Sequence, residues 1–172
     1  MHHRYDIVFP TLSWILKNPN RFLAFGFGIG LIRYASGTFG TILAWLIWFL
    51  IRSNLTNLNI SIFLIFSFLY GCWICNQVSV SLGNKDHVGI VFDEIVSFWF
   101  ILWSVPENLI IQFISFLLFR FFDSVKPGPI KFFEKKLQGG IGIMMDDFIA
   151  AILTIFIVNS TLVINGSLFF IK

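Results

Sequence analysis

Five carboxylates are the residues of this chain whose type and spacing best suit chemistry. They form two adjacent pairs and one single residue along the sequence. Each group stands at or near the end of an apolar run, where an ion must be solvated, paired or bound to metal. Oxygen-only ligand sets suit a hard cation, above all Mg²⁺, which also keeps waters and takes a substrate phosphate. The sequence therefore predicts a magnesium site with the ligands Asp93, Glu94, Asp123, Asp146 and Asp147.

A lysine lies close to the middle carboxylate. Lys126 follows Asp123 by three residues, so the two share a face if that turn is helical, and Pro127 then ends the helix. A fixed ammonium beside a metal is what a phosphoryl group needs as its charge redistributes. Any one acidic pair alone is more simply explained as a favourable helix end. All the groups together favour a phosphoryl-transfer site, with the catalytic candidates Asp93, Glu94, Asp123, Lys126, Asp146 and Asp147.

A glycine-rich segment, R-Y-A-S-G-T-F-G-T (33–41), leads into the apolar run 42–51. Ser36 or Thr38 can cap the helix that follows, and the free N–H groups of a helix start can bind phosphate. The alternative is a simple helix cap preceded by close-packed glycines. On the first interpretation, Ser36, Gly37 and Thr38 bind substrate together with Lys126.

The composition indicates an integral membrane protein. The chain of 172 residues is 57% hydrophobic and 12% charged and contains 23 phenylalanines, more aromatic surface than a soluble domain of this size could bury. We expect one all-α domain, residues 1–172, folded as a membrane-embedded helical bundle. Several apolar runs are shorter than the roughly 20 residues of a perpendicular span, so one hairpin could penetrate only partly. The expected spans, about five, lie near 38–51, 59–80, 92–105, 109–122 and 147–165.

The basic residues are distributed unequally across these spans. Ten of the twelve Lys and Arg fall on one side, and only Arg52 and Lys172 fall on the other. The positive-inside rule then places the N-terminal segment 1–21 and the charged segment 119–147 in the cytoplasm, with the C-terminus outside. All the acidic residues except Glu107 share the cytoplasmic side. We therefore expect the active site to face the cytoplasm.

Other chemistries find little support in the sequence. Cys72 and Cys75 are the only cysteines and lie within an apolar run, so we interpret them as buried helix residues and not as a redox or zinc site. The chain has no phosphate-binding G-x-x-x-x-G-K-[ST] loop and no G-x-S-x-G elbow, and we expect no nucleic-acid partner. Two rival functions remain open: a small membrane transporter of cations, since intramembrane carboxylates often mark ion paths, and a non-enzymatic membrane assembly protein.

Three motifs resemble those of the phosphatidylglycerophosphatase A family. They are D-H-x-x-x-V-x-D-E (86–94), F-R-F-F-D-x-x-K-P-x-P-I (119–130) and G-G-x-G-I-M-x-D-D (139–147), and the glycine-rich region 25–40 is also similar. The resemblance implies a multi-pass, Mg²⁺-dependent lipid phosphatase of the bacterial cytoplasmic (inner) membrane. Such an enzyme converts phosphatidylglycerophosphate to phosphatidylglycerol in phospholipid biosynthesis. Matched by position, the site residues that the resemblance implies are the five carboxylates and Lys126 of this chain. Gly139 and Gly140 join the predicted substrate-binding residues.

The mechanism that these residues favour is metal-assisted hydrolysis. The metal would neutralise the phosphate, and a spare carboxylate could act as the base. A covalent aspartyl-phosphate is the alternative route, and the sequence does not decide between the two. Adjacent residues on a helix point about a hundred degrees apart, so we expect only one member of each acidic pair to reach the metal directly.

Overall fold

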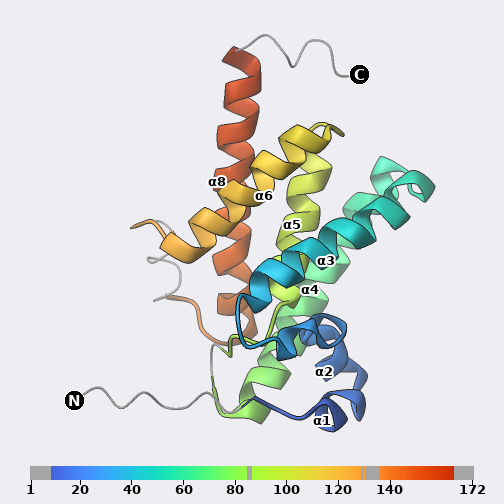
Figure 1. Cartoon of the computed structure of the whole chain (residues 1–172), viewed down its shortest axis with the longest axis vertical. Helices are drawn as coiled ribbons and strands as arrows, with labels where there is room; N and C mark the ends of the chain where they lie inside the picture. The colour runs from blue at the N-terminus through green and yellow to red at the C-terminus, as the bar shows by residue number, and fades with distance from the viewer. Residues whose placement is uncertain (1–8, 85–86, 129, 131–135, 165–172) are drawn as a thin grey trace.

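The computed structural model describes residues 9–84, 87–128, 130 and 136–164, and every element assigned among them is helical (Figure 1). The bundle consists of helices that correspond to the predicted apolar runs: α3 (Ser36–Ile51), α4 (Asn57–Leu82), α5 (Phe92–Ser104), α6 (Leu109–Val125) and α8 (Gly139–Ile164). The short elements are α1 (Leu12–Leu16), α2 (Pro19–Ala24), η1 (Gly26–Leu31) and η2 (Arg52–Asn54). The predicted all-α fold is confirmed for the described residues.

Among the described residues, three segments are long and apolar enough to cross a membrane: Ser36–Asn54, Asn57–Leu82 and Gly139–Ile164. Large apolar side chains on them are turned outward; Leu50 and Phe156, for example, are 73% and 70% exposed. Such a surface suits hydrocarbon and would be a liability in water. Helices α5 and α6 have 13 and 17 residues, short for a perpendicular span. The fold thus supports a membrane protein, and the five-span count stays a prediction.

Helix α5 lies at the centre of the bundle, where it packs against α3, α4, α6 and α8. Most of its residues are buried, including Phe98 and Ile101 at 0% exposure. The indole N–H of Trp99 donates to the backbone oxygen of Ala44 at 2.9 Å and so ties α5 to α3. A helix surrounded in this way has a fixed position and rotation, which holds the acidic residues of its first turn in place.

Glycines allow α8 to approach α4 closely. A Cβ at Gly140 would overlap the carbonyl oxygen of Cys72, and a Cβ at Gly71 would lie 2.7 Å from the sulfur of Met144. Cys75 is fully buried on the same face of α4, with its sulfur 4.0 Å from that of Met144. Both cysteines lie within a helix, and the expectation of a buried position holds fully for Cys75 and in part for Cys72, which is half-buried.

The start of the last helix differs from the prediction. We expected a span from residue 147, with Asp146 and Asp147 at its first turn, but α8 begins at Gly139 and has no acidic residue in that turn. The two aspartates stand about two turns further along the helix. At the other end of the chain, α1 is capped by Thr11, which accepts from the N–H of Trp14.

We expect Gly140→Ala to lower the thermal unfolding temperature in detergent by several degrees. The added methyl group meets backbone, which cannot move aside cheaply, and overpacking of this kind costs about 1–3 kcal/mol. Gly128→Ala is the matched control, because a Cβ there meets nothing within 4 Å. Equal unfolding temperatures for Gly140→Ala and the parent protein would contradict the close packing of α4 and α8.

We also expect reporter fusions after Lys136 and after Lys172 to report opposite sides of the membrane. One predicted span separates these two positions, and the distribution of basic residues puts the first in the cytoplasm. A cytoplasmic signal from both fusions would exclude the five-span arrangement.

Candidate active site

One cavity of about 430 Å³ collects the charged residues of the bundle. It lies where α3, α5 and α8 begin and α6 ends, on the side of the bundle that carries α1 and α2 (Figure 1). All six predicted catalytic residues line it, although they come from α5, the end of α6 and α8. The charged residues in its wall are Asp93, Glu94, Asp123, Asp146, Asp147, Arg33, Arg120 and Lys126.

Asp93, Glu94 and Asp147 form an acidic cluster within this cavity. One carboxylate oxygen from each lies within 4.8 Å of those of the other two. Glu94 Oε2 and Asp147 Oδ2 are buried and accept no hydrogen bond from the described residues. Three carboxylates this close repel one another unless a proton or a cation lies between them. The donor set, all oxygen and largely shielded from solvent, fits a hard divalent cation such as Mg²⁺.

The members of the acidic pairs face different partners. Both residues of the first pair, Asp93 and Glu94, belong to the cluster. In the second pair, Asp147 joins the cluster and Asp146 faces Lys126 instead, as successive helix residues point about a hundred degrees apart. The expectation that only one member of each pair reaches the metal stays a prediction.

Asp123 lies beside the acidic cluster, next to Asp147, and pairs with Arg120. The two are three residues apart on α6, and Arg120 Nη2 lies 3.0 Å from Asp123 Oδ2. The same guanidinium places Nη1 3.8 Å from Glu94 Oε1, so it joins Asp123 to the cluster. The sequence analysis did not select Arg120 as a site residue. The signal was present, because this residue is a charge inside the apolar helix α6, within the motif that also holds Asp123.

Lys126 occupies a conformation that few residues other than glycine adopt. Helix α6 ends at Val125, and Lys126 has a φ of 45° and a ψ of 68°, in the left-handed region. The turn at Lys126 is therefore not helical, so the condition under which Lys126 and Asp123 would share a helical face is not met. The ammonium instead lies 3.2 Å from Asp146 Oδ2, which carries it toward α8. A left-handed backbone costs a side-chain-bearing residue about 1–3 kcal/mol, and such strain is often found at functional sites.

The glycine-rich segment contributes to the cavity in an unexpected way. The residue before α3 is Ala35, and no side chain caps that helix, so capping by Ser36 or Thr38 is wrong. The hydroxyl of Ser36 donates to the carbonyl oxygen of Val88 instead. Ser36 and Gly37 line the cavity, whereas Thr38 is absent from its wall. A Cβ at Gly37 would overlap Glu94 Oε1, so this position must remain small.

Two predicted substrate-binding glycines lie outside the cavity. Gly139 and Gly140 are not in its wall and pack against α4. The backbone N–H of Gly140 donates to Asn76 Oδ1 at 3.2 Å. Their place in the structure is therefore helix packing, and the predicted role in substrate binding is not supported by their position.

His87 is a further cavity residue that the sequence analysis left without a role. It is buried, with 3% of its surface exposed, and its Nδ1 accepts from the N–H of Gly89 at 3.0 Å. That loop is also held by the N–H of Val91, which donates to the carbonyl oxygen of Ala24. These two hydrogen bonds hold the loop that forms this part of the cavity wall.

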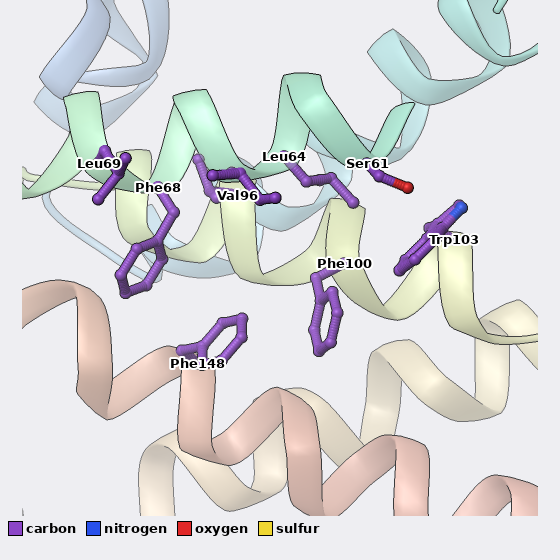
Figure 2. A pocket seen from close by; sticks show the side chains of 9 residues that line it. Ser61, Leu64, Phe68, Leu69, Val96, Phe100, Trp103 and Phe148 are labelled. Carbon is purple, nitrogen blue, oxygen red and sulfur yellow. The ribbon is translucent and has the colours of Figure 1, made fainter. Parts of the chain in front are cut away.

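A second cavity, of about 250 Å³, lies between α4, α5 and α8 and has a different character. Figure 2 shows Phe68, Phe100 and Phe148 gathered beside it, with Trp103 at one end. Its one polar side chain is Ser61, whose hydroxyl already donates to Asn57 O at 2.8 Å. None of the residues that line it is charged, so this apolar pocket offers no group for catalysis.

The comparisons with known proteins agree with this geometry. The family model "Phosphatidylglycerophosphatase A" matches residues 22–161. A Haemophilus influenzae protein named phosphatidylglycerophosphatase A is 43% identical over 154 residues, which cover 87% of this chain and 92% of that protein. An Escherichia coli protein of the same name is 35% identical over 141 residues, 81% of each chain. No solved structure matches. The chain therefore belongs to the phosphatidylglycerophosphatase A family and is a phosphatase.

Proposed function

We propose that this phosphatase removes the terminal phosphate of phosphatidylglycerophosphate, releasing phosphatidylglycerol and inorganic phosphate for phospholipid biosynthesis. The observation that carries the proposal is the acidic cluster of Asp93, Glu94 and Asp147 in one cavity with three basic side chains. Two relatives that match most of this chain bear the name of that activity. A metal-assisted phosphomonoester hydrolysis needs these groups: carboxylates, cations and a shielded space.

The position of the cavity favours a lipid substrate. The cavity lies at one end of helices whose sides expose large apolar residues. A phosphorylated headgroup could therefore enter the cavity while its acyl chains stay in the bilayer. A soluble sugar phosphate would gain nothing from the surrounding hydrocarbon. The positive-inside distribution of basic residues favours the cytoplasmic face of the bacterial inner membrane for this end.

We further propose that Mg²⁺ is the cofactor and that Asp93, Glu94 and Asp147 hold it. The wall of the cavity carries five carboxylates and three basic side chains, a formal charge of −2 that would repel a phosphate. A bound divalent cation would offset this charge, polarise the phosphoryl group and lower the pKa of a bound water. The chemistry of the donors disfavours zinc, because Cys75 is buried within α4, away from the cavity.

The remaining side chains would act on the phosphate directly. Lys126 is held over the cavity by its left-handed backbone and by Asp146, so its ammonium can bind a phosphoryl oxygen. Asp146 is then a positioning residue for Lys126. A carboxylate of the cavity that is not occupied by metal would take the proton of the attacking water. A covalent aspartyl-phosphate is the competing route.

Chelation should abolish activity, and Mg²⁺ should restore it. Phosphate release from phosphatidylglycerophosphate in mixed micelles would be measured in excess EDTA and after Mg²⁺ is added back. Full activity in EDTA would refute the metal proposal.

Asp147→Asn removes one buried ligand charge and should weaken Mg²⁺ binding, measured by calorimetry, by tenfold or more. As a control, the double change Cys72→Ala and Cys75→Ala should leave catalysis largely intact.

Lys126→Met and Asp146→Asn should each lower turnover by about a hundredfold or more. The first removes the ammonium while keeping the length, the second removes the charge that positions it, and losing one preorganised electrostatic contact has this scale. Lys136→Met is the matched control, since Lys136 is exposed and absent from the cavity wall. Normal turnover by both variants would mean that the site is placed wrongly.

The substrate class is tested with the parent protein. Phosphate release should be far faster from phosphatidylglycerophosphate than from glycerol 3-phosphate, because only the lipid keeps its acyl chains in the bilayer. Equal rates on the two substrates, at matched concentrations, would refute the lipid assignment.

A further inference from the structure

Arg120 carries hydrogen-bond donors that the described protein does not use. Its side chain is 18% exposed, and Asp123 and Glu94 are its ionic neighbours at 3.0 and 3.8 Å. Nε and Nη1 are shielded from solvent, yet no acceptor among the described residues receives a hydrogen bond from either. A guanidinium stays charged at any physiological pH, so it cannot relieve this by losing a proton. Leaving a buried charged donor without an acceptor is costly, and each such group in a native protein calls for an explanation.

We propose that Arg120 binds the phosphoryl group of the substrate through the N–H groups that Asp123 and Glu94 leave without acceptors. This inference rests on the proposed function, because it assumes that a phosphate enters the cavity. The guanidinium is suited to the task, since it offers several fixed donors in one plane and matches phosphate geometry. Asp123 then orients Arg120 from one helical turn away and is a positioning residue.

The surroundings of Arg120 place it beside the reacting centre. Glu94 belongs to the acidic cluster and also lies next to Nη1, so a phosphate held by Arg120 would lie at the edge of the cluster. On the other side, a Cβ at Gly37 would come within 2.8 Å of Nη2. A glycine therefore leaves the guanidinium its space, at the start of the segment that the sequence predicted to bind phosphate.

A purely compensating role for Arg120 is the competing explanation. In that case the guanidinium only reduces the repulsion between Glu94 and Asp123. Its replacement would then lower the stability of the protein but leave its affinity for phosphate nearly unchanged. The pair Arg52–Glu107 offers a comparison within the same chain: its atoms lie 2.7 Å apart, and the side chains are 31% and 62% exposed, outside the charged cavity. Arg52 is thus a matched arginine with a carboxylate partner and no phosphate to bind.

The test measures the dissociation constant of inorganic phosphate, the product, by calorimetry on the purified protein in detergent with Mg²⁺ present. Arg120→Gln should raise this constant tenfold or more, and Arg120→Lys should raise it by a smaller factor of at least threefold, because a lysine keeps the charge and loses the planar donors. Arg52→Gln should leave it unchanged. In the hydrolysis assay, Arg120→Gln should lower kcat/KM by about a hundredfold or more, the scale of one lost electrostatic contact.

An unchanged phosphate constant in the Arg120 variants would overturn the inference. If Arg120→Gln shows no cooperative unfolding transition, Arg120→Lys decides alone, because it keeps a positive charge facing both carboxylates. The outcome separates this inference from the proposed function. If the protein hydrolyses phosphatidylglycerophosphate but binds phosphate equally well without Arg120, only the inference is refuted. If phosphate binding depends on Arg120 but the parent protein leaves phosphatidylglycerophosphate intact, only the substrate assignment is refuted.

Discussion

The concentration of five carboxylates in one cavity of an apolar bundle is the constraint on which the rest of the structure depends. Isolated charges next to hydrocarbon are costly, so each needs a partner close by. Arg120 lies against Asp123 and Lys126 against Asp146, both within 3.2 Å. The acidic cluster keeps two buried oxygens, Glu94 Oε2 and Asp147 Oδ2, that accept no hydrogen bond among the described residues. The cavity thus holds more negative than positive side chains, and this excess is the basis of the proposed cation site.

Helix packing determines which carboxylate faces which partner. Helix α5 is fixed on all sides, and α8 is held against α4 through Gly140 and Gly71. A rotation of α8 by one residue would turn the side chains by about a hundred degrees and exchange the roles of Asp146 and Asp147. Glycines that look like phosphate-binding residues in the sequence thereby act at a distance, because they fix the rotation of the helix that carries two of the acids.

The sequence singled out the carboxylates and Lys126 because charge is rare in this chain and falls at the ends of apolar runs, and all six side chains line one cavity. It predicted the helices for the same reason. The start of α8 was missed, since a segment with three glycines has low helical propensity and only the packing against α4 makes it helical. Arg120 was counted only as a topological charge. Its spacing of three residues from Asp123 was visible in the sequence, but its contact with Glu94 on α5 arises only when the helices pack.

Charge asymmetry in this protein serves two purposes at once. Arg120 and Lys126 belong to the basic excess that predicts a cytoplasmic orientation, and both line the charged cavity. The acids they pair with come from helix ends or, on α8, from the third turn, so the site lies near one face of the predicted bundle and not at mid-span.

A transporter would need a polar path onward through the bundle. The second cavity, between α4, α5 and α8, is lined by aromatic and aliphatic residues and supplies no such path (Figure 2). The arrangement suits an enzyme that meets its substrate at the membrane surface and releases a soluble ion back to the same side.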